Sequence, residues 1–221
     1  MAGLYSQPGA LPAVISRVSR VVNSQDDPLE AQLLELTSAA EGLHRLLRPA
    51  QKRMTKKQAS GARAIALEAV KDLDEDVRDA VGAALHHLTD PSYPRRLLDL
   101  AEQVREAVPG VTGDTQEWKK RVTNARNELA HKLKSGFLDD DIDAQEYAAL
   151  LLSLGWLLTG LLLLQTGISP AALGNRISSH KPYRGFLNQV RALLPAVYTH
   201  DQDPSDTAMR HAPGQCPAKE D

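Results

Sequence analysis

Apolar residues recur at spacings of three and four along much of the chain, which is the pattern of amphipathic helices. The clearest example lies between Pro28 and Arg48, and its apolar positions are Leu29, Leu33, Leu36, Ala40, Leu43 and Leu47. Pro28 suits the first position of a helix, and Pro49 cannot continue one. We therefore predict a helix over residues 28–48, preceded by a shorter helix over about 12–22.

The same spacing predicts five further segments. They are a helix over about 60–88 with a break near 72–76, helices over 94–108, 115–133 and 144–166, and a last helix over 182–194. A short helix or turn is expected at ISPAALGNRI. Asp114 with Glu117, and Asp143 with Glu146, have the spacing of capping boxes. Since no segment has the pattern of a strand, we predict an all-α antiparallel bundle of about five main helices, without a sheet.

Composition supports a helical core. Of the 221 residues, 42% are apolar but only 4% are aromatic, so that Leu, Ala and Val must build the interior. We predict a short N-terminal extension over residues 1–27, a helical domain over 28–198, and a polar, disordered tail over 199–221. The single cysteine, Cys216, excludes a disulfide framework, and no signal peptide is recognised, which predicts a cytoplasmic protein.

Residues 147–164 contain no charged side chain, and a run of 18 such positions is long enough to cross a bilayer. The other interpretation is a central bundle helix that is buried on all sides. No basic cluster flanks the run, and several amphipathic helices need an apolar partner. We therefore favour the core helix and predict no membrane association.

Two clusters of side chains are of the types that bind metal ions. Asp139 to Asp143 are dense in carboxylates, but they lack the glycine and downstream glutamate of a calcium loop, so helix capping is favoured. His86 and His87 are adjacent and would point about 100° apart on a helix, which prevents a shared ligand pair. We predict neither a metal nor another cofactor.

The helix over 115–133 combines an apolar stripe with a polar one. The apolar stripe is Trp118, Val122, Ala125, Leu129 and Leu133, and the polar stripe is Lys120, Asn124, Asn127 and His131. Arg126 lies at the border, about 140° around the helix from His131. Residues 118–134 hold six Lys or Arg and one Glu, in a chain of net charge −2. A basic helix end needs no function, because the helix dipole favours it, and the spacing alone favours that interpretation.

The stretch Arg126-Asn127-Glu128-Leu129-Ala130-His131 resembles the Arg-polar-x-x-x-His signature of the HEPN superfamily, which includes many ribonucleases. The surrounding EWKKRVTNARNELAHKL and SYPRRLLDLAEQV are similar to the C-terminal HEPN domain of ApeA-like anti-phage proteins. The stretch LLELTSAAEGLHRLL also resembles the first helix of that domain, with Glu41 and Arg45 in matching places. The resemblance covers residues 29–194 and implies a HEPN-like fold.

ApeA-like proteins usually carry a large β-rich domain before the HEPN domain, whereas about 28 residues precede it here. A stand-alone domain, a truncated gene and the loss of a sensing half are all compatible with this difference. A sensor or antitoxin protein is a further candidate partner.

The resemblance implies an endoribonuclease without a metal, in which the 2′-hydroxyl of the RNA attacks the adjacent phosphate. In this scheme His131 is the acid or base, Arg126 holds the phosphate, and Asn127 orients His131 or contacts the phosphate. Lys120, Asn124, Lys132 and Lys134 would bind the RNA backbone, with Glu41 and Arg45 as weaker supporting candidates. HEPN domains pair around a two-fold axis, so a homodimer is expected, with a role in phage defence or as a toxin. The alternative is a non-catalytic module that binds RNA, a nucleotide or a protein.

Overall fold

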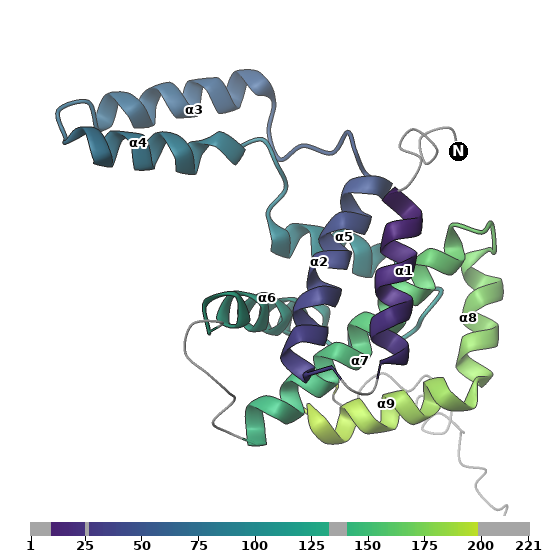
Figure 1. The fold of residues 1–221 in the computed structure, drawn as a ribbon. Coiled ribbons are helices and arrows are strands. Elements are labelled where there is room, and N and C mark those ends of the chain that lie inside the picture. Colours follow the sequence, from purple (N-terminus) through teal and green to yellow (C-terminus); the bar gives the residue numbers. More distant parts are fainter. Residues whose placement is uncertain (1–9, 25–26, 133–140, 199–221) are drawn as a thin grey trace, which may run out of the picture.

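The computed structural model describes residues 10–24, 27–132 and 141–198, and within them the chain forms nine α-helices, one short 3-10 helix and no strand (Figure 1). The helices are α1 (Ala10–Asn23), α2 (Leu29–Leu47), α3 (Lys56–Ala69), α4 (Glu75–Ala84), α5 (Tyr93–Val104), α6 (Thr115–Lys132), α7 (Asp141–Leu164), α8 (Pro170–Ser179) and α9 (Lys181–Leu193). The 3-10 turn, η1, spans Leu85–His87. The predicted all-α class is confirmed.

Helix α7 is the central element of the body. It packs against α1, α2, α5, α6, α8 and α9, and its fully buried large side chains are Leu150, Leu154, Leu157, Leu158 and Leu161. Among the described residues, Ala144–Leu164 is the one segment long and apolar enough to cross a membrane, and 56% of that window is buried inside the protein. The other positions of the run are partly buried and none is exposed, so the run packs inside the protein but is not buried on all sides as the core-helix interpretation required.

Helix α1 lies along α2 and α7 and belongs to the same core (Figure 1). Its buried side chains, Val14, Val18 and Val21, follow the spacing of three and four residues that marks one helix face. The segment predicted as a short N-terminal extension therefore contributes a packed helix to the bundle.

The predicted helix over residues 60–88 is two helices instead of one. Helix α3 begins earlier, at Lys56, because Thr55 and Gln58 form a capping box. The chain then breaks between Ala69 and Glu75, where the sequence had indicated an interruption, and returns as α4. The two helices form a hairpin that extends away from the body (Figure 1), and none of their side chains is buried.

Helix α6 is anchored at its start and along its buried face. Asp114 Oδ1 accepts hydrogen bonds from the backbone N–H groups of Gln116 and Glu117, which is one half of the predicted capping box. The other half is replaced, because the Asp114 N–H donates to the carbonyl of Val197 and not to Glu117. Farther along, the buried Trp118 Nε1 donates to Ser153 Oγ on α7 at 2.9 Å. These contacts fix the rotation of α6 about its axis and hence the direction in which its polar residues point.

The other predicted helices are confirmed with shifted ends. Helix α5 ends at Val104, four residues before its predicted end. Helix α7 begins at Asp141, so the prediction that Asp143 caps it is wrong, because Asp143 is the third residue of the helix. Of the acidic run Asp139–Asp143, Asp139 and Asp140 lie outside the described residues. The tail over residues 199–221 and the side chains of residues 131, 132 and 141–143 also lie outside them.

Candidate functional site

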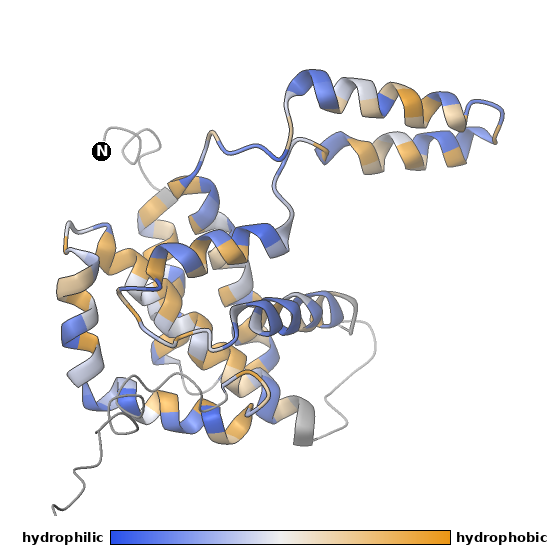
Figure 2. Cartoon of the chain, turned by 180° about the vertical axis from the view of Figure 1, so that it is seen from behind, coloured by the Kyte–Doolittle hydropathy of each residue, from blue (hydrophilic) through white to orange (hydrophobic). Residues whose placement is uncertain are grey.

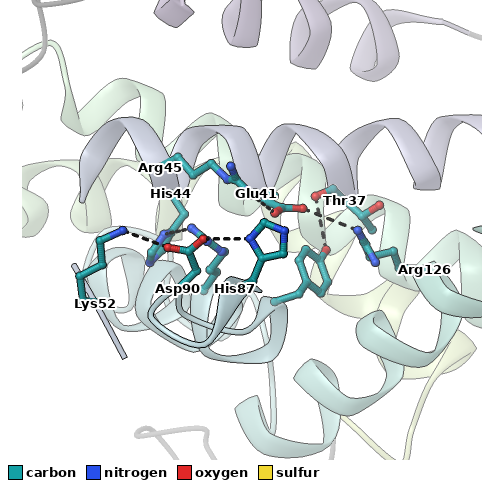
Figure 3. Close-up of polar contacts among 10 residues, drawn as sticks. Thr37, Glu41, His44, Arg45, Lys52, His87, Asp90 and Arg126 are labelled. Atoms are coloured by element: carbon teal, nitrogen blue, oxygen red, sulfur yellow. Dashed lines mark hydrogen bonds and ion pairs between the residues drawn. The ribbon is translucent and has the colours of Figure 1, made fainter. Parts of the chain in front are cut away.

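Arg126 lies where α6 meets α2, and a carboxylate from α2 faces it (Figure 3). Arg126 Nη2 is 3.6 Å from Glu41 Oε2, while the other carboxylate oxygen, Glu41 Oε1, accepts a hydrogen bond from Arg45 Nη2 at 2.8 Å. Glu41 is therefore shared between two guanidinium groups. The structure brings together Arg126, Glu41 and Arg45, which the sequence had singled out from two distant segments.

An aromatic ring from α5 forms the next side of this cluster. The guanidinium carbon of Arg126 lies 4.8 Å from the centre of the Tyr93 ring, which is the distance of a cation–π contact. The Tyr93 hydroxyl donates to the backbone carbonyl of Thr37 on α2 at 3.4 Å. Burial raises the pKa of the Tyr93 hydroxyl, so this group stays a neutral donor. Arg126 is thus held in place by α2 and α5, yet 35% of its side chain remains exposed.

Asn127 is exposed and its side-chain oxygen accepts a hydrogen bond of 3.4 Å from Arg126 Nη1. Lys120 and Asn124 line a groove of about 500 Å³ on the other side of α6, which Pro94 of α5 also lines. Around an ideal helix, these two residues lie about 120° and about 160° from Arg126. Lys120 and Asn124 therefore belong to the polar stripe, separate from the Arg126 cluster.

The remaining predicted site residues fall at the end of the described part of α6. Helix α6 is α-helical through Lys132, so the backbone position of His131 is about 140° around the helix from Arg126. The side chains of His131 and Lys132, and the whole of Lys134, lie outside the described residues. A regular helix of this length excludes a break between Arg126 and His131 as the means of bringing them together.

A buried polar network lies on α2 and α5, beside the Arg126 cluster. His44 is fully buried, and its Nδ1 accepts a hydrogen bond from Arg96 Nη1 at 3.2 Å, since an arginine can only donate. The other ring nitrogen, Nε2, therefore carries the proton and donates to Asp99 Oδ2 at 3.1 Å. Gln51 Nε2 donates to the same Asp99 oxygen at 2.7 Å. Together these bonds connect α2 to α5.

The pKa values of His44 and Asp99 follow from their burial and from their hydrogen bonds. Burial lowers the pKa of His44, and the charge of Arg96 acts in the same direction, while Asp99 opposes the change. At Asp99, burial raises the pKa, but the hydrogen bonds from His44 and Gln51 and the charge of Arg95 act against it, and its pKa lies below the usual value. The network consequently holds a neutral histidine beside an ionised aspartate.

A third polar group lies between η1 and α5. Lys52 Nζ is 2.9 Å from Asp90 Oδ1, and His87 Nδ1 is 3.5 Å from Asp90 Oδ2 (Figure 3). The hydrogen bond from Lys52 is the main cause that lowers the pKa of Asp90. His87 is 77% exposed and differs in its surroundings from the buried His44. The sequence predicted that His86 and His87 are ordinary residues near a helix end, and both lie in η1, directly after α4.

Sequence reasoning did not identify Tyr93, His44 and Asp99 as parts of this region. A signal was available for Asp99, because it falls inside the apolar pattern of α5, between the buried Leu97 and Leu100. A carboxylate at such a position requires hydrogen-bonding partners. Tyr93 offered no comparable signal, since its role depends on the approach of α6. Within the described part of the chain, no group of three or more His, Cys, Asp or Glu side chains could hold a metal ion.

Comparison with known proteins gives one family match. The family model described as Apea-like HEPN matches residues 34–171, which is more than half of the chain. No curated protein and no solved structure gives a significant match. The matched range extends from α2 to the start of α8 and includes Glu41, Arg45, Tyr93, Arg126 and His131. The all-α fold, the extent of the match and the placement of these residues agree, and the chain belongs to the Apea-like HEPN family.

Proposed function

We propose that this protein is a cytoplasmic, metal-independent endoribonuclease that serves in phage defence or as a toxin. The observation that carries the proposal is the placement of Arg126 within the family motif. Its guanidinium is oriented by Glu41 and Tyr93 but remains partly exposed, on a helix end that is rich in Lys and Arg. A guanidinium that is already oriented can bind a phosphate without a further loss of side-chain entropy.

The proposed reaction is an internal transfer within RNA. The 2′-oxygen attacks the adjacent phosphorus as its proton passes to a base, and the bond from phosphorus to the 5′-oxygen breaks. The departing 5′-oxygen takes up a proton, so the products end in a 2′,3′-cyclic phosphate and a 5′-hydroxyl. His131 supplies the acid or base, because an imidazole exchanges protons near neutral pH.

Arg126 would stabilise the charge that develops on the non-bridging phosphate oxygens. A guanidinium has five N–H donors in a plane, and the contacts with Glu41 and Asn127 involve only its two terminal nitrogens. The distance of 3.6 Å to Glu41 is long for a hydrogen bond, so a phosphate can compete for the same donors. Asn127 would contact the phosphate or orient His131, which lies one helical turn later.

The polar stripe of α6 would hold the RNA strand next to the reacting phosphate. Lys120 is 65% exposed, and Asn124 lines the same groove. Lys132 and Lys134 extend the positive charge toward the end of the motif. Lysines of this kind attract the phosphate backbone without selecting a base sequence.

The angle of about 140° between Arg126 and His131 favours a site that two chains share. If two copies of α6 face each other across a two-fold axis, Arg126 of one copy can act beside the motif histidine of the other. We therefore include a homodimer in the proposal. A sensor or antitoxin protein that regulates the site would be a further partner.

Cleavage of total bacterial RNA in the presence of EDTA tests this proposal. The wild type should produce fragments that end in cyclic phosphate, and Arg126→Ala and His131→Ala should each reduce cleavage by at least about 100-fold, the usual contribution of an acid–base or charge-stabilising group.

Matched controls are Arg105→Ala, an exposed arginine on the C-cap of α5, and His180→Ala, which lies between α8 and α9. Both controls should cut like the wild type. If the folded wild type does not cut RNA, or if all variants cut it equally, the assignment of the ribonuclease to this motif is wrong.

A non-catalytic module that binds RNA, a nucleotide or a protein is the second candidate. The observation in its favour is that Glu41 and Tyr93 already engage Arg126, so its charge is partly offset. In that case the purified protein would bind RNA in a salt-dependent manner that Arg126→Ala weakens, and would leave the RNA intact.

A further inference from the structure

A run of basic residues joins the end of α2 to the start of α3. Residues 45–58 hold six Lys or Arg and no Asp or Glu, in a chain that has more acidic than basic residues overall. We call these six residues the connector cations, and they are Arg45, Arg48, Lys52, Arg53, Lys56 and Lys57. Every one of them is exposed, and all but Arg45 lie outside the site described above.

The connector between the two helices is held in a defined conformation. The backbone N–H of Arg53 donates to the carbonyl of Thr89 at 2.8 Å, and Thr55 caps the start of α3. These bonds involve backbone and neutral groups, so they do not use the charged ends of the side chains. Beside them lies a groove of about 650 Å³, which Lys52, Arg53 and Lys56 line among others. The cations therefore surround a surface that is formed before any ligand arrives.

Most of the connector cations have no acidic partner. Lys52 is paired with Asp90, and Arg45 is paired with Glu41. Within the part of the chain that the structure describes, no ion pair is formed by the other four, Arg48, Arg53, Lys56 and Lys57. Like charges that are gathered without counter-charges repel each other in the folded chain, and a bound anion would remove this repulsion.

Two of these cations occupy positions that the helix dipole disfavours. Lys56 and Lys57 are the first two residues of α3, and the first turn of α3 holds no acidic residue. The N-terminus of a helix carries partial positive charge, which favours Asp or Glu and opposes Lys. Arg45 and Arg48 lie at the end of α2, where the dipole is sufficient to account for them. The stability of α3 does not account for its two lysines, whereas binding of an anion does.

The connector cations continue a row that begins at Arg126. Glu41, which faces Arg126, lies four residues before Arg45 and seven before Arg48, so the three residues share one side of α2. Figure 3 shows Arg45 between Arg126 and Lys52 along that helix. The rise along α2 from Glu41 to Arg48 is about 10 Å. A strand that is bound at Arg126 can therefore reach the connector within a few nucleotides.

We propose that the connector cations form a second RNA-binding surface, which holds the phosphate backbone on one side of Arg126 while Lys120 and Asn124 hold it on the other. The choice of RNA as the ligand rests on the proposed function. Lys and Arg side chains bind phosphates without reading the bases, so this surface would favour long strands over short ones and would not select a sequence.

Binding of an RNA that cannot be cleaved tests this surface without requiring a reaction. The probe is a fluorescent RNA of about 16 nucleotides in which every 2′-hydroxyl is methylated. The connector variant combines Arg48→Gln, Arg53→Gln and Lys56→Gln. Fluorescence anisotropy at about 0.1 M salt should give a Kd about 10- to 100-fold above that of the wild type. The slope of log K against log salt should become less steep by about 2, because each lost phosphate contact removes about 0.7.

The matched control removes two arginines and one lysine elsewhere on the surface. It combines Arg176→Gln, Lys181→Gln and Arg184→Gln, at exposed positions of α8 and α9, which lie away from the connector (Figure 1). This control should bind the probe like the wild type, and circular dichroism should show that both variants keep their helices. Equal losses of affinity in the two variants, or no loss in the connector variant, would overturn the proposal.

Cleavage kinetics separate this surface from the catalytic motif. The connector variant should raise KM for RNA more than it lowers kcat, because its contacts are the same in the ground state and in the transition state. Absence of cleavage by the wild type would contradict the ribonuclease alone, since the binding assay needs no reaction. Unchanged binding by the connector variant, in a protein that cleaves RNA, would contradict the connector surface alone.

An anionic membrane is the other polyanion that such a row of cations could meet. Sedimentation with vesicles of phosphatidylcholine and phosphatidylserine provides the comparison. The connector variant and the wild type should differ in RNA binding and not in vesicle binding. A connector variant that loses binding to the vesicles and keeps its affinity for the RNA probe would overturn the proposal.

Discussion

Arg126 has partners from two other helices, and each contact restricts it differently. The Glu41 carboxylate attracts its charge at 3.6 Å, and the Tyr93 ring centre lies 4.8 Å from its guanidinium carbon. Asn127, its neighbour on α6, accepts a hydrogen bond from Nη1. A charged group with 35% of its side chain exposed would otherwise sample many rotamers. At the scale of single residues, the site consists of one cation whose direction is set by a carboxylate, an aromatic ring and an amide.

Tyr93 should act as a positioning residue through its ring, and the hydroxyl should contribute little. Tyr93→Leu removes the cation–π contact, which is worth about 0.5–2 kcal/mol. We expect kcat for RNA cleavage to fall roughly 2- to 30-fold, because Arg126 then loses part of its orientation in the transition state. Tyr93→Phe keeps the ring and loses only the hydrogen bond to Thr37, so kcat should stay within about twofold of the wild type.

Steady-state kinetics of both variants, together with their melting temperatures, would measure this. A purely structural role predicts that kcat follows stability in both variants. Equal loss of kcat in Tyr93→Phe and Tyr93→Leu would mean that the hydroxyl, and not the ring, positions the arginine.

Hydrogen bonds connect helices α2 and α5 at two neighbouring positions along their length. At one position Tyr93 donates to the carbonyl of Thr37, and at the next Arg96 and Asp99 bind the two ring nitrogens of His44. Tyr93 and Arg96 are three residues apart on α5, so they lie on the same side of that helix. The register between α2 and α5 therefore decides both the buried network and the position of Tyr93 beside Arg126. At the scale of elements, the His44 network therefore fixes the position of α5 relative to α2 and with it the position of Tyr93.

The His44 network should make stability depend on pH. The pKa of His44 is lowered from 6.5 in the folded protein, so between the two values the unfolded chain binds more protons than the folded one. The contribution of His44 to stability is therefore complete above pH 6.5 and is lost as the pH falls below it. The lowered pKa of Asp99 acts in the same sense, but only near and below its usual value of 3.8.

Urea unfolding at about pH 7.5 and about pH 5.5 would measure this dependence. The wild type should lose stability at the lower pH, and His44→Gln should lose less, although it is less stable at both. Gln is uncharged at both pH values, so the variant has no titration at this position. The same loss in both proteins would show that other groups cause the acid sensitivity.

The whole molecule consists of a packed body and one projecting hairpin (Figure 1). In the body, α7 is surrounded by six helices, whereas α3 and α4 pack mainly on each other and on η1. Few buried contacts mean that local opening costs little free energy. Figure 2 shows hydrophobic residues along both helices of the hairpin, and none of them is buried. The hairpin should consequently be the least stable part of the described chain.

Amide hydrogen exchange should reveal this difference. Amides of α3 and α4 should exchange faster than those of α2 and α7 in dilute protein, because they can open without unfolding the body. Peptide-level mass spectrometry would measure the exchange of each helix. Hairpin amides as slow as those of α7 would contradict this view.

Much of the helical architecture was accessible from residue spacing. The apolar repeats predicted the helices, and the prolines and the break near Asp72–Asp76 predicted most of their limits. The predicted helices differ from the structure where contacts between distant segments determine the packing. Val14, Val18 and Val21 are too few to indicate a core helix on their own, but α2 and α7 cover them and make α1 part of the bundle. The start of α3 depended on Thr55, whose cap was not recognised.

The candidate site was predictable in part, for a physical reason. Arg126, Asn127 and His131 lie in one short motif, and Glu41 with Arg45 lies one helical turn apart, so both groups have local signatures. Their roles in catalysis stay predictions. Tyr93, His44 and Asp99 have no such signature, because each contributes through a partner at least 33 residues away, as in the contact of Tyr93 with Arg126.

The sequence by itself determined the all-α class, the positions of the helices and the family motif, because these follow from periodicities and spacings within single segments. Only the tertiary structure decided that Glu41 and Tyr93 meet at Arg126 and that His44 connects α2 to α5. It also decided that α3 and α4 project from the body with no buried side chain. Each of these arrangements depends on how rigid helices pack around α7, and that packing is a property of all the helices together.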